Sequence, residues 1–295
     1  MKKRVLKTKK AMENRISELS ENSYDYIPDS LITTDHFTFP NEETEIKFMR
    51  FCCKSSFFCE GVDRVFKEYD LLQTFPRRDF EDEDKEKNGI AFLYRSPDGK
   101  LRGIKEASYG FDYPSHILAK REYIWADKNI DGTSKDCYSN EISRLEKELM
   151  QDIMFNPLPC PFGLHLVAKR PGSVIRVFDN NNSALKGAIY DPDSIYIAAD
   201  EEQLAGDLAK EAFKGRKVIY YPRRNKVGEA QFMSHDLRKR GVRIAINTLI
   251  ADVKPLVMFG DHDITDYIEC RLKEEWDKSQ IFAEIQKYDE SAMYF

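Results

Sequence analysis

The sequence lacks the cysteine spacings that mark a zinc finger. None of its six cysteines forms a C-x-x-C pair, and no histidines accompany them at metal-ligand spacing. This argues against a zinc finger, and unpaired cysteines are typical of a reduced, cytoplasmic setting. The cysteines are Cys52, Cys53, Cys59, Cys137, Cys160 and Cys270.

Long apolar runs and a dominant positive charge are also missing. No apolar stretch approaches transmembrane length, and the basic residues 1–10 are not followed by the apolar core of a secretory signal, so we expect no membrane contact. The net charge is -5, with 33% charged residues, and does not by itself indicate a nucleic-acid-binding protein. Local clusters must therefore support any such function. The segment 1–10 is either a solvated tail or an arm that seeks phosphate.

The sequence has no local signature of nucleophilic catalysis and no glycine-rich phosphate loop. Its five histidines are far apart, and none has a matching ligand four residues on. They are His36, His116, His165, His235 and His262. For His262, which stands beside Asp263, we expect a capping or core role.

Three short runs rich in β-branched residues organise the chain. They cover residues 173–178, 194–199 and 216–221, and they alternate with segments suited to helices. This alternation predicts an α/β fold with a mostly parallel central sheet. Each run ends in charged or turn-forming residues. Because open α/β sheets bind ligands at the carboxyl ends of their strands, we expect the chemistry there.

The length of 295 residues allows a substantial core and more than one domain. We expect a basic and polar tail over 1–23, an α+β subdomain over 24–160, an α/β domain over 161–270 and a helical tail over 271–295. Further helices are expected over 42–53, 61–69, 140–151, 201–213 and 264–287.

A β-hairpin is predicted in the N-terminal half. Residues 90–95 and 100–107 flank the turn sequence SPDG at 96–99. We expect the second strand to point Arg102 and Lys105 outward as solvated edge charges. An acidic loop, 80–89, precedes the hairpin.

Besides the strands and the hairpin, the chain contains a set of short motifs in a fixed order. They comprise Asp98, Gly99, Arg102, Gly103, Lys105, Asn156 to Cys160, Phe162, Gly163, His165, Leu166, 177–184, 214–222, Asn225 and 263–268. Together these motifs resemble those of TOPRIM-containing, primase-like proteins of bacterial mobile elements, which are similar to the catalytic core of bacterial replicative primases. The resemblance covers about residues 24–272, and such proteins often carry a zinc finger that this chain lacks.

The resemblance implies an α/β domain beginning near Phe162, with an α+β subdomain packed against it. It also implies a two-part acidic site. A glutamate after the first strand would do acid/base work, and an aspartate pair after a later strand would hold Mg²⁺.

This sequence departs from that pattern at both positions. Asp179 stands where the family has glutamate, and residues 222–225 read PRRN where an aspartate should follow the proline. At an effective dielectric of about 20, two unit charges about 4 Å apart interact by roughly 4 kcal/mol, and a divalent ion doubles this. Exchanging an attracting carboxylate for a repelling guanidinium therefore costs a metal site more than about 10 kcal/mol before screening. We expect no metal cofactor, whereas arginine at this place suits phosphate.

One alternative preserves a metal site. Asp200 and Glu202 follow the second strand and, with Asp179 and Asp263, form the candidate catalytic set of an active Mg²⁺ enzyme. The competing interpretation places Asp200, Glu201 and Glu202 in the first turn of a helix, where they complement exposed amides and the helix dipole.

Basic residues gather around the third strand and continue into the next helix. Part of this set is explained by solvated turns and by a helix C-terminus before Gly241. The candidate nucleic-acid or phosphate ligands are Arg223, Arg224, Lys226, Arg216, Lys217, Arg102 and Lys105. The remaining basic residues of the cluster are Lys214, Arg238, Lys239 and Arg240.

Three functional hypotheses follow. The first is a catalytically degenerate, primase-like protein that binds nucleic acid or phosphate on behalf of a mobile element. The second is an active metal-dependent nuclease or nucleotidyl transferase. The third is a protein-binding adaptor that uses the C-terminal helices and the acidic loop.

Overall fold

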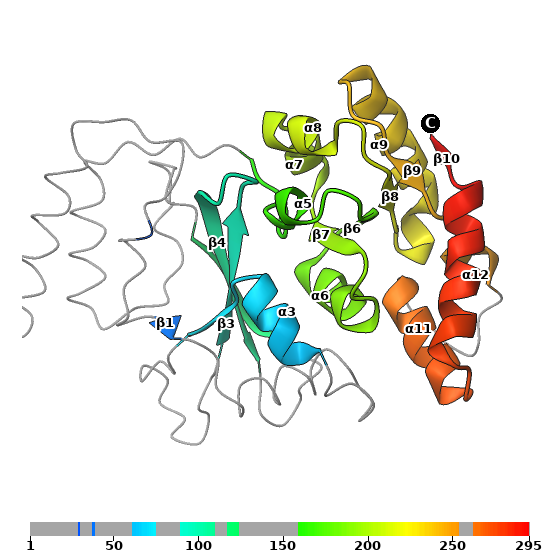
Figure 1. Ribbon diagram of the computed structural model, residues 1–295, viewed down its shortest axis with the longest axis horizontal. Coiled ribbons are helices and arrows are strands. Elements are labelled where there is room, and N and C mark those ends of the chain that lie inside the picture. The colour runs from blue at the N-terminus through cyan, green and yellow to red at the C-terminus, as the bar shows by residue number, and fades with distance from the viewer. Residues whose placement is uncertain are drawn as a thin grey trace, which may run out of the picture.

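The computed structural model describes residues 29, 37–38, 61–74, 89–109, 117–123, 159–253 and 262–294. Two five-stranded sheets and the helices around them make up this part of the chain (Figure 1). Several sequence-based expectations lie outside the described residues. These are the basic tail, the acidic loop, the helices expected over 42–53 and 140–151, and Cys52, Cys53, Cys59 and Cys137.

The first sheet is antiparallel and has the strand order β1-β2-β3-β4-β5. Its β3–β4 hairpin confirms the predicted one, and Gly99 in the turn has a φ of 83°. Strand β5 was not predicted, because the segment that contains it is aromatic and polar without a clear period. The strands are β1 (Phe37–Thr38), β2 (Leu72–Thr74), β3 (Gly89–Arg95), β4 (Leu101–Tyr109) and β5 (Ile117–Tyr123).

The prediction that Arg102 points into solvent is wrong. Arg102 is only 6% exposed, and its Nε donates to Ser96 Oγ at 3.1 Å. Its Nη2 lies 4.0 Å from Asp98 Oδ1. A buried cation needs such partners, and the turn that precedes β4 supplies them. Arg102 is therefore part of the hairpin's own structure.

The second sheet confirms the predicted α/β fold. Its strand order is β10-β9-β8-β6-β7, and every pair is parallel except the antiparallel pair of β9 with β10. Strands β9 and β10 were not predicted, since two residues are too few to show a period. The strands are β6 (Ile175–Phe178), β7 (Ile195–Ala198), β8 (Val218–Tyr220), β9 (Ala245–Ile246) and β10 (Met293–Tyr294).

Helices cover both faces of the second sheet. In Figure 1, α6 lies on one side of β6 and β7, and α7 and α8 lie on the other. The helix predicted over 201–213 is in fact two helices, because Gly206 takes an extended conformation with φ -69° and ψ 156°. The helical segments are α3 (Val62–Glu68), α5 (Leu166–Lys169), α6 (Asn181–Tyr190), α7 (Glu201–Ala205), α8 (Asp207–Phe213), the 3₁₀ turn η2 (Arg224–Lys226), α9 (Val227–Lys239), α10 (Leu249–Asp252), α11 (Ile264–Lys273) and α12 (Lys278–Ser291).

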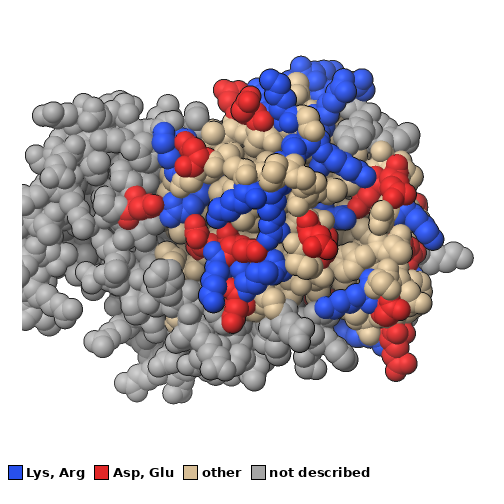
Figure 2. Space-filling view, in the orientation of Figure 1, with Lys and Arg blue, Asp and Glu red and all other residues tan. Residues whose placement is uncertain are grey.

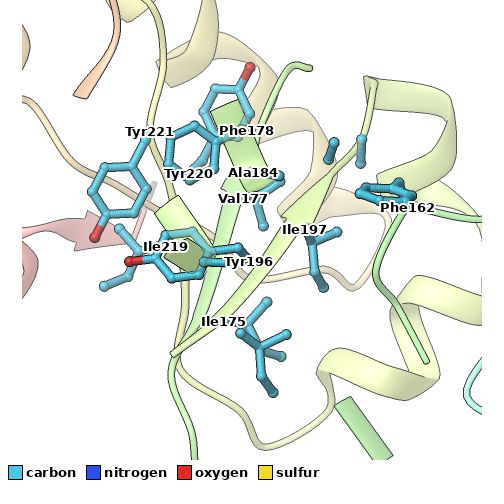
Figure 3. Close-up of a cluster of buried hydrophobic side chains, with 14 of the residues drawn as sticks. Phe162, Ile175, Val177, Phe178, Ala184, Tyr196, Ile197, Ile219, Tyr220 and Tyr221 are labelled. Atoms are coloured by element: carbon cyan, nitrogen blue, oxygen red, sulfur yellow. The ribbon is translucent and has the colours of Figure 1, made fainter. Parts of the chain in front are cut away.

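Phe162 joins the two sheets. Its backbone pairs with Ala198 at the edge strand β7, with N–H···O distances of 2.8 and 3.1 Å. Its buried ring lies 5.3 Å from the ring of Tyr69 and 5.6 Å from those of Phe92 and Tyr94. Figure 3 shows Phe162 beside the strands of the second sheet. Hydrophobic side chains of both sheets therefore form one continuous core, and the predicted domain boundaries stay predictions.

A largely buried arginine ties α12 to β6, an interior strand of the second sheet. Arg176 of β6 donates from Nη1 to Asp289 Oδ2 of α12 at 2.5 Å and from Nε to Ser194 Oγ at 3.0 Å. Tyr221 also donates to Asp289, at 2.5 Å, and its ring stacks on that of Phe178 (Figure 3). Although burial favours the neutral form, the acids and phenols around Arg176 raise its pKa. The segment after residue 270 is thus packed into the second sheet.

Gly163 provides a test of this packing. Its φ is 82°, and a Cβ there would lie 2.7 Å from the carbonyl oxygen of Tyr196. We expect Gly163→Ala to lower the free energy of unfolding by on the order of 1–3 kcal/mol, since both backbones would have to move. The matched control is Gly228→Ala in α9, where no heavy atom lies within 4 Å and the change should stabilise by about 0.5–1 kcal/mol. Urea unfolding measures both, and effects of the same sign would contradict this account.

Candidate functional site

The strand order brings the carboxyl ends of β6 and β8 together. The chain passes from β6 to β7 on one side and then crosses to β8 on the other side of β6. The loops that leave β6 and β8 therefore diverge, and open α/β sheets bind their ligands outside the strand ends at such a switch point. Asp179 follows β6 directly, and Arg223 lies three residues after the end of β8.

Asp179 and Arg223 form an ion pair in this position. Arg223 Nε lies 2.8 Å from Asp179 Oδ2, and the two side chains are 34% and 21% exposed. The other carboxylate oxygen, Oδ1, accepts from Asn180 Nδ2 at 2.8 Å. Both oxygens of the first predicted acid are thus engaged by donors of the protein itself. At this exposure the pair adds only about 1 kcal/mol to stability. Its main consequence is that the guanidinium of Arg223 offsets the negative charge of Asp179.

Arg224 and Lys226 extend the positive charge away from this pair. The backbone N–H of Arg224 donates to His262 O at 2.9 Å, which anchors the start of η2. Within the described part of the chain, no hydrogen bond or ion pair engages the guanidinium of Arg224. Lys226 is exposed. These two cations remain available to an anionic ligand.

Asp263 lies close to the site but serves as a helix cap. It is 6% exposed, and its Oδ1 accepts from Thr265 N at 2.7 Å and from Thr265 Oγ1 at 2.6 Å. Ser183 of α6 donates to its other oxygen. Asp263 rather than His262 is therefore the residue that caps α11. His262 Nδ1 lies 3.5 Å from Asp266 Oδ2.

Tyr220 marks the electrostatic surroundings of the pair. Burial raises its pKa most, and the carboxylates of Asp179 and Glu229 raise it further, while Arg223 lowers it. Glu229, in the first turn of α9, was not among the predicted site residues. The sequence could have indicated Glu229, because it lies in the first turn of the helix that follows residues 222–225.

Asp200 and Glu202 do not join these side chains. Asp200 caps α7, accepting from Gln203 N at 2.8 Å, while Gln203 Oε1 accepts from Asp200 N at 3.1 Å. Glu202 is exposed in the first turn of α7. Within the residues that the structure describes, no hydrogen bond or ion pair connects either one to Asp179 or Asp263. This geometry agrees with the helix-cap interpretation.

Arg216 and Lys217 precede β8 and so lie at the opposite end of that strand from Arg223. Arg216 donates to three backbone carbonyls, those of Val167, Arg170 and Ser173, at 2.8–3.2 Å. It therefore stabilises the loops at the amino end of the sheet. Lys217 is exposed there.

Lys105 is connected to the site through Tyr94. The Nζ of Lys105 lies 5.3 Å from the centre of the Tyr94 ring, and the Tyr94 hydroxyl is hydrogen-bonded to the side-chain amide of Asn181 at 3.0–3.1 Å. Asn181 begins α6, two residues after Asp179. The first sheet thus brings Lys105 near Tyr94, which contacts the start of α6, and its role as a phosphate ligand stays a prediction.

Within the described residues, no group of three or more His, Cys, Asp or Glu side chains is arranged to hold a metal ion. Cys160 is buried, and this burial raises the pKa of its thiol to about 12. None of the described helices is both long and apolar enough to cross a membrane.

The fold and site define an α/β protein with an ion pair of Asp179 and Arg223 at the carboxyl edge of a mostly parallel sheet. The chain belongs to the family described as "Domain of unknown function (DUF6371)", whose model matches residues 47–224. A search of curated proteins finds no match to this sequence.

Two solved structures are similar in arrangement. One is a chain in the structure of bacteriophage T7 lagging-strand DNA polymerase interacting with primase domains of two gp4 subunits bound to an RNA/DNA hybrid and dTTP. It has a TM-score of 0.40 and 13% identity, and the match covers 76% of this chain and 85% of that one. The other is the Aquifex aeolicus primase (zinc-binding and RNA polymerase domains), with a TM-score of 0.42, 11% identity, and coverage of 87% of this chain and 63% of that one.

The two aspartate caps predict different costs. Asp200→Ala removes an exposed cap and should lower stability by about 1 kcal/mol. Asp263→Ala should cost on the order of 3 kcal/mol, because it leaves the buried hydroxyls of Ser183 and Thr265 without their acceptor. Urea unfolding compares the two variants, and equal losses would contradict the placement of Asp263 in a buried network.

Proposed function

We propose that this protein is a primase-like protein that binds nucleic-acid phosphate, without a catalytic metal, at the carboxyl ends of β6 and β8. The observation that supports it is the Arg223–Asp179 ion pair, at 2.8 Å, at the place where an acidic site would hold Mg²⁺. A guanidinium there offsets the charge of the first acid and repels a divalent cation.

Three cations supply the proposed phosphate contacts. Arg224 offers a planar fork that can donate two hydrogen bonds to one phosphate, and Lys226 and Lys105 offer further point charges. Phosphate contacts fix the path of a nucleic acid without reading its sequence, so we expect binding with little sequence preference. The sequence resemblance to proteins of mobile elements supports a role in replication, mobilisation or defence of such an element.

The first test is binding of labelled DNA and RNA oligonucleotides at a series of salt concentrations. We expect Arg223→Gln/Arg224→Gln to weaken binding and to reduce the slope of log K against log [salt] by roughly 1–2, since each phosphate contact contributes about 0.7–0.9. Arg224→Gln alone keeps the Arg223–Asp179 pair and should reduce the slope by about one contact. These measurements also compare DNA with RNA.

The matched control for this test is Lys273→Gln/Lys287→Gln. It removes the same charge from exposed positions on α11 and α12 and should leave the slope unchanged. If both double variants lose the same nucleic-acid affinity, only the net charge of the protein matters, and the proposed site is contradicted. A wild-type protein with no salt-dependent binding of any nucleic acid would sink the proposal and favour the adaptor hypothesis.

The second test separates this function from a metal-dependent nuclease or nucleotidyl transferase that uses Asp179, Asp200, Glu202 and Asp263. Calorimetric titration with Mg²⁺ and Mn²⁺ should give the same weak heats for the wild type and for Asp179→Ala. We expect Arg223→Asp to gain Mn²⁺ binding, because an attracting charge then stands beside Asp179. Tight wild-type binding that Asp179→Ala abolishes would support the enzyme instead.

A further inference from the structure

Helix α9 carries an exposed aromatic side chain in the middle of a positively charged segment. Phe232 is 77% exposed and is the one large hydrophobic residue that stands exposed among the side chains that the structure describes. A single exposed apolar residue is common on protein surfaces and carries little meaning alone. Phe232 is significant because of the charged residues around it.

The segment 223–243 has a charge opposite to that of the whole chain. It contains seven Lys or Arg against two Asp or Glu, a net of +5, whereas the complete chain has -5. Cations stand at both ends of α9. The exposed ones are Lys226 before the helix and Arg238, Lys239, Arg240 and Arg243 at its end and beyond. Figure 2 shows blue side chains gathered at the end of the molecule where Figure 1 places one end of α9.

The spacing along α9 places Phe232 between these cations. Lys226 precedes it by six residues, or about 9 Å of helix, and Lys239 follows by seven residues, about 10 Å further and on the same side of the helix. Gly228, one turn before Phe232, has no heavy atom within 4 Å of a Cβ position. Helical side chains lean toward the preceding turn, so the ring has free space beside it.

We propose that α9 is a binding surface for single-stranded nucleic acid, on which Phe232 stacks against a base while the cations at both ends of the helix contact the backbone. This rests on the proposed function, because it continues the path of a strand held at Arg224. Aromatic rings in a cationic groove are the usual means of binding single strands without sequence preference. A duplex keeps its base faces stacked on one another and offers none to the ring.

A protein partner fits this surface less well. The exposed side chains around Phe232 on α9 are Glu229, His235, Asp236 and Lys239, so the apolar area is a single ring. The core of a stable protein interface is a larger apolar area depleted of charge. A nucleotide needs only the face of one ring and a nearby cation.

The test compares a single-stranded oligonucleotide with an abasic oligomer of equal length, which keeps the phosphates and lacks the bases. We expect Phe232→Ala to weaken binding of the oligonucleotide by roughly 5- to 100-fold and to leave the abasic oligomer and a duplex unaffected. The salt dependence should not change, because no charge is removed. Phe232→Leu keeps apolar bulk without a π-face and should lose most of the affinity, whereas Phe232→Trp should retain it.

The Phe232→Trp variant also gives a direct signal. Its fluorescence should be quenched by the oligonucleotide and not by the abasic oligomer. If Phe232→Ala binds the oligonucleotide as tightly as the wild type, or loses the abasic oligomer equally, the stacking proposal is overturned.

The outcomes also separate this inference from the proposed function. If Arg223→Gln/Arg224→Gln loses affinity and Phe232→Ala does not, the binding site is at the carboxyl ends of β6 and β8, and the role of α9 is refuted. If Phe232→Ala loses affinity and the double arginine variant does not, nucleic acid binds on α9, and the proposed site at the ends of β6 and β8 is refuted. No binding by the wild type would refute both.

Discussion

The pairing of Phe162 with the edge of β7 is the contact on which the arrangement of the two sheets depends. Two backbone hydrogen bonds hold Phe162 against Ala198, and its ring fills the space between Tyr69, Phe92 and Tyr94. Gly163 permits this approach, because its positive φ and missing Cβ leave room for the Tyr196 carbonyl. With the sheets held this way, the Tyr94 hydroxyl reaches Asn181 at the start of α6, and Lys105 lies over the Tyr94 ring.

A second constraint acts through the largely buried Arg176. A guanidinium within an interior strand must be neutralised, because removing an unpaired charge from water costs several kcal/mol. Asp289 supplies the charge from α12, more than a hundred residues later in the chain, and Asn247 donates to the same carboxylate at 2.7 Å. The C-terminal helices are thereby bound to the sheet that holds Asp179 and Arg223, and Asp263, the N-cap of α11, accepts from Ser183 of α6.

The site shows where sequence reasoning succeeds and where it stops. The three parallel strands, their carboxyl ends and the positions of Asp179 and Arg223 follow from short apolar runs with polar ends, and the structure agrees. The sequence also left open whether Asp200 caps a helix, and the hydrogen bonds with Gln203 favour the cap. The predicted outward orientation of Arg102 was wrong. Alternation along a strand does not reveal that the preceding turn offers acceptors for a buried cation.

The sequence by itself determined the local elements of this protein, since strands, turns and caps depend on neighbours a few residues away. It also determined which charges stand at the strand ends, including the exchange of an acid for arginine. Tertiary structure alone decided which of these charges meet. Only the strand order, with β6 between β7 and β8, brings Arg223 to Asp179, and only long-range packing leaves Phe232 exposed, because contacts between distant segments have no period that a sequence displays.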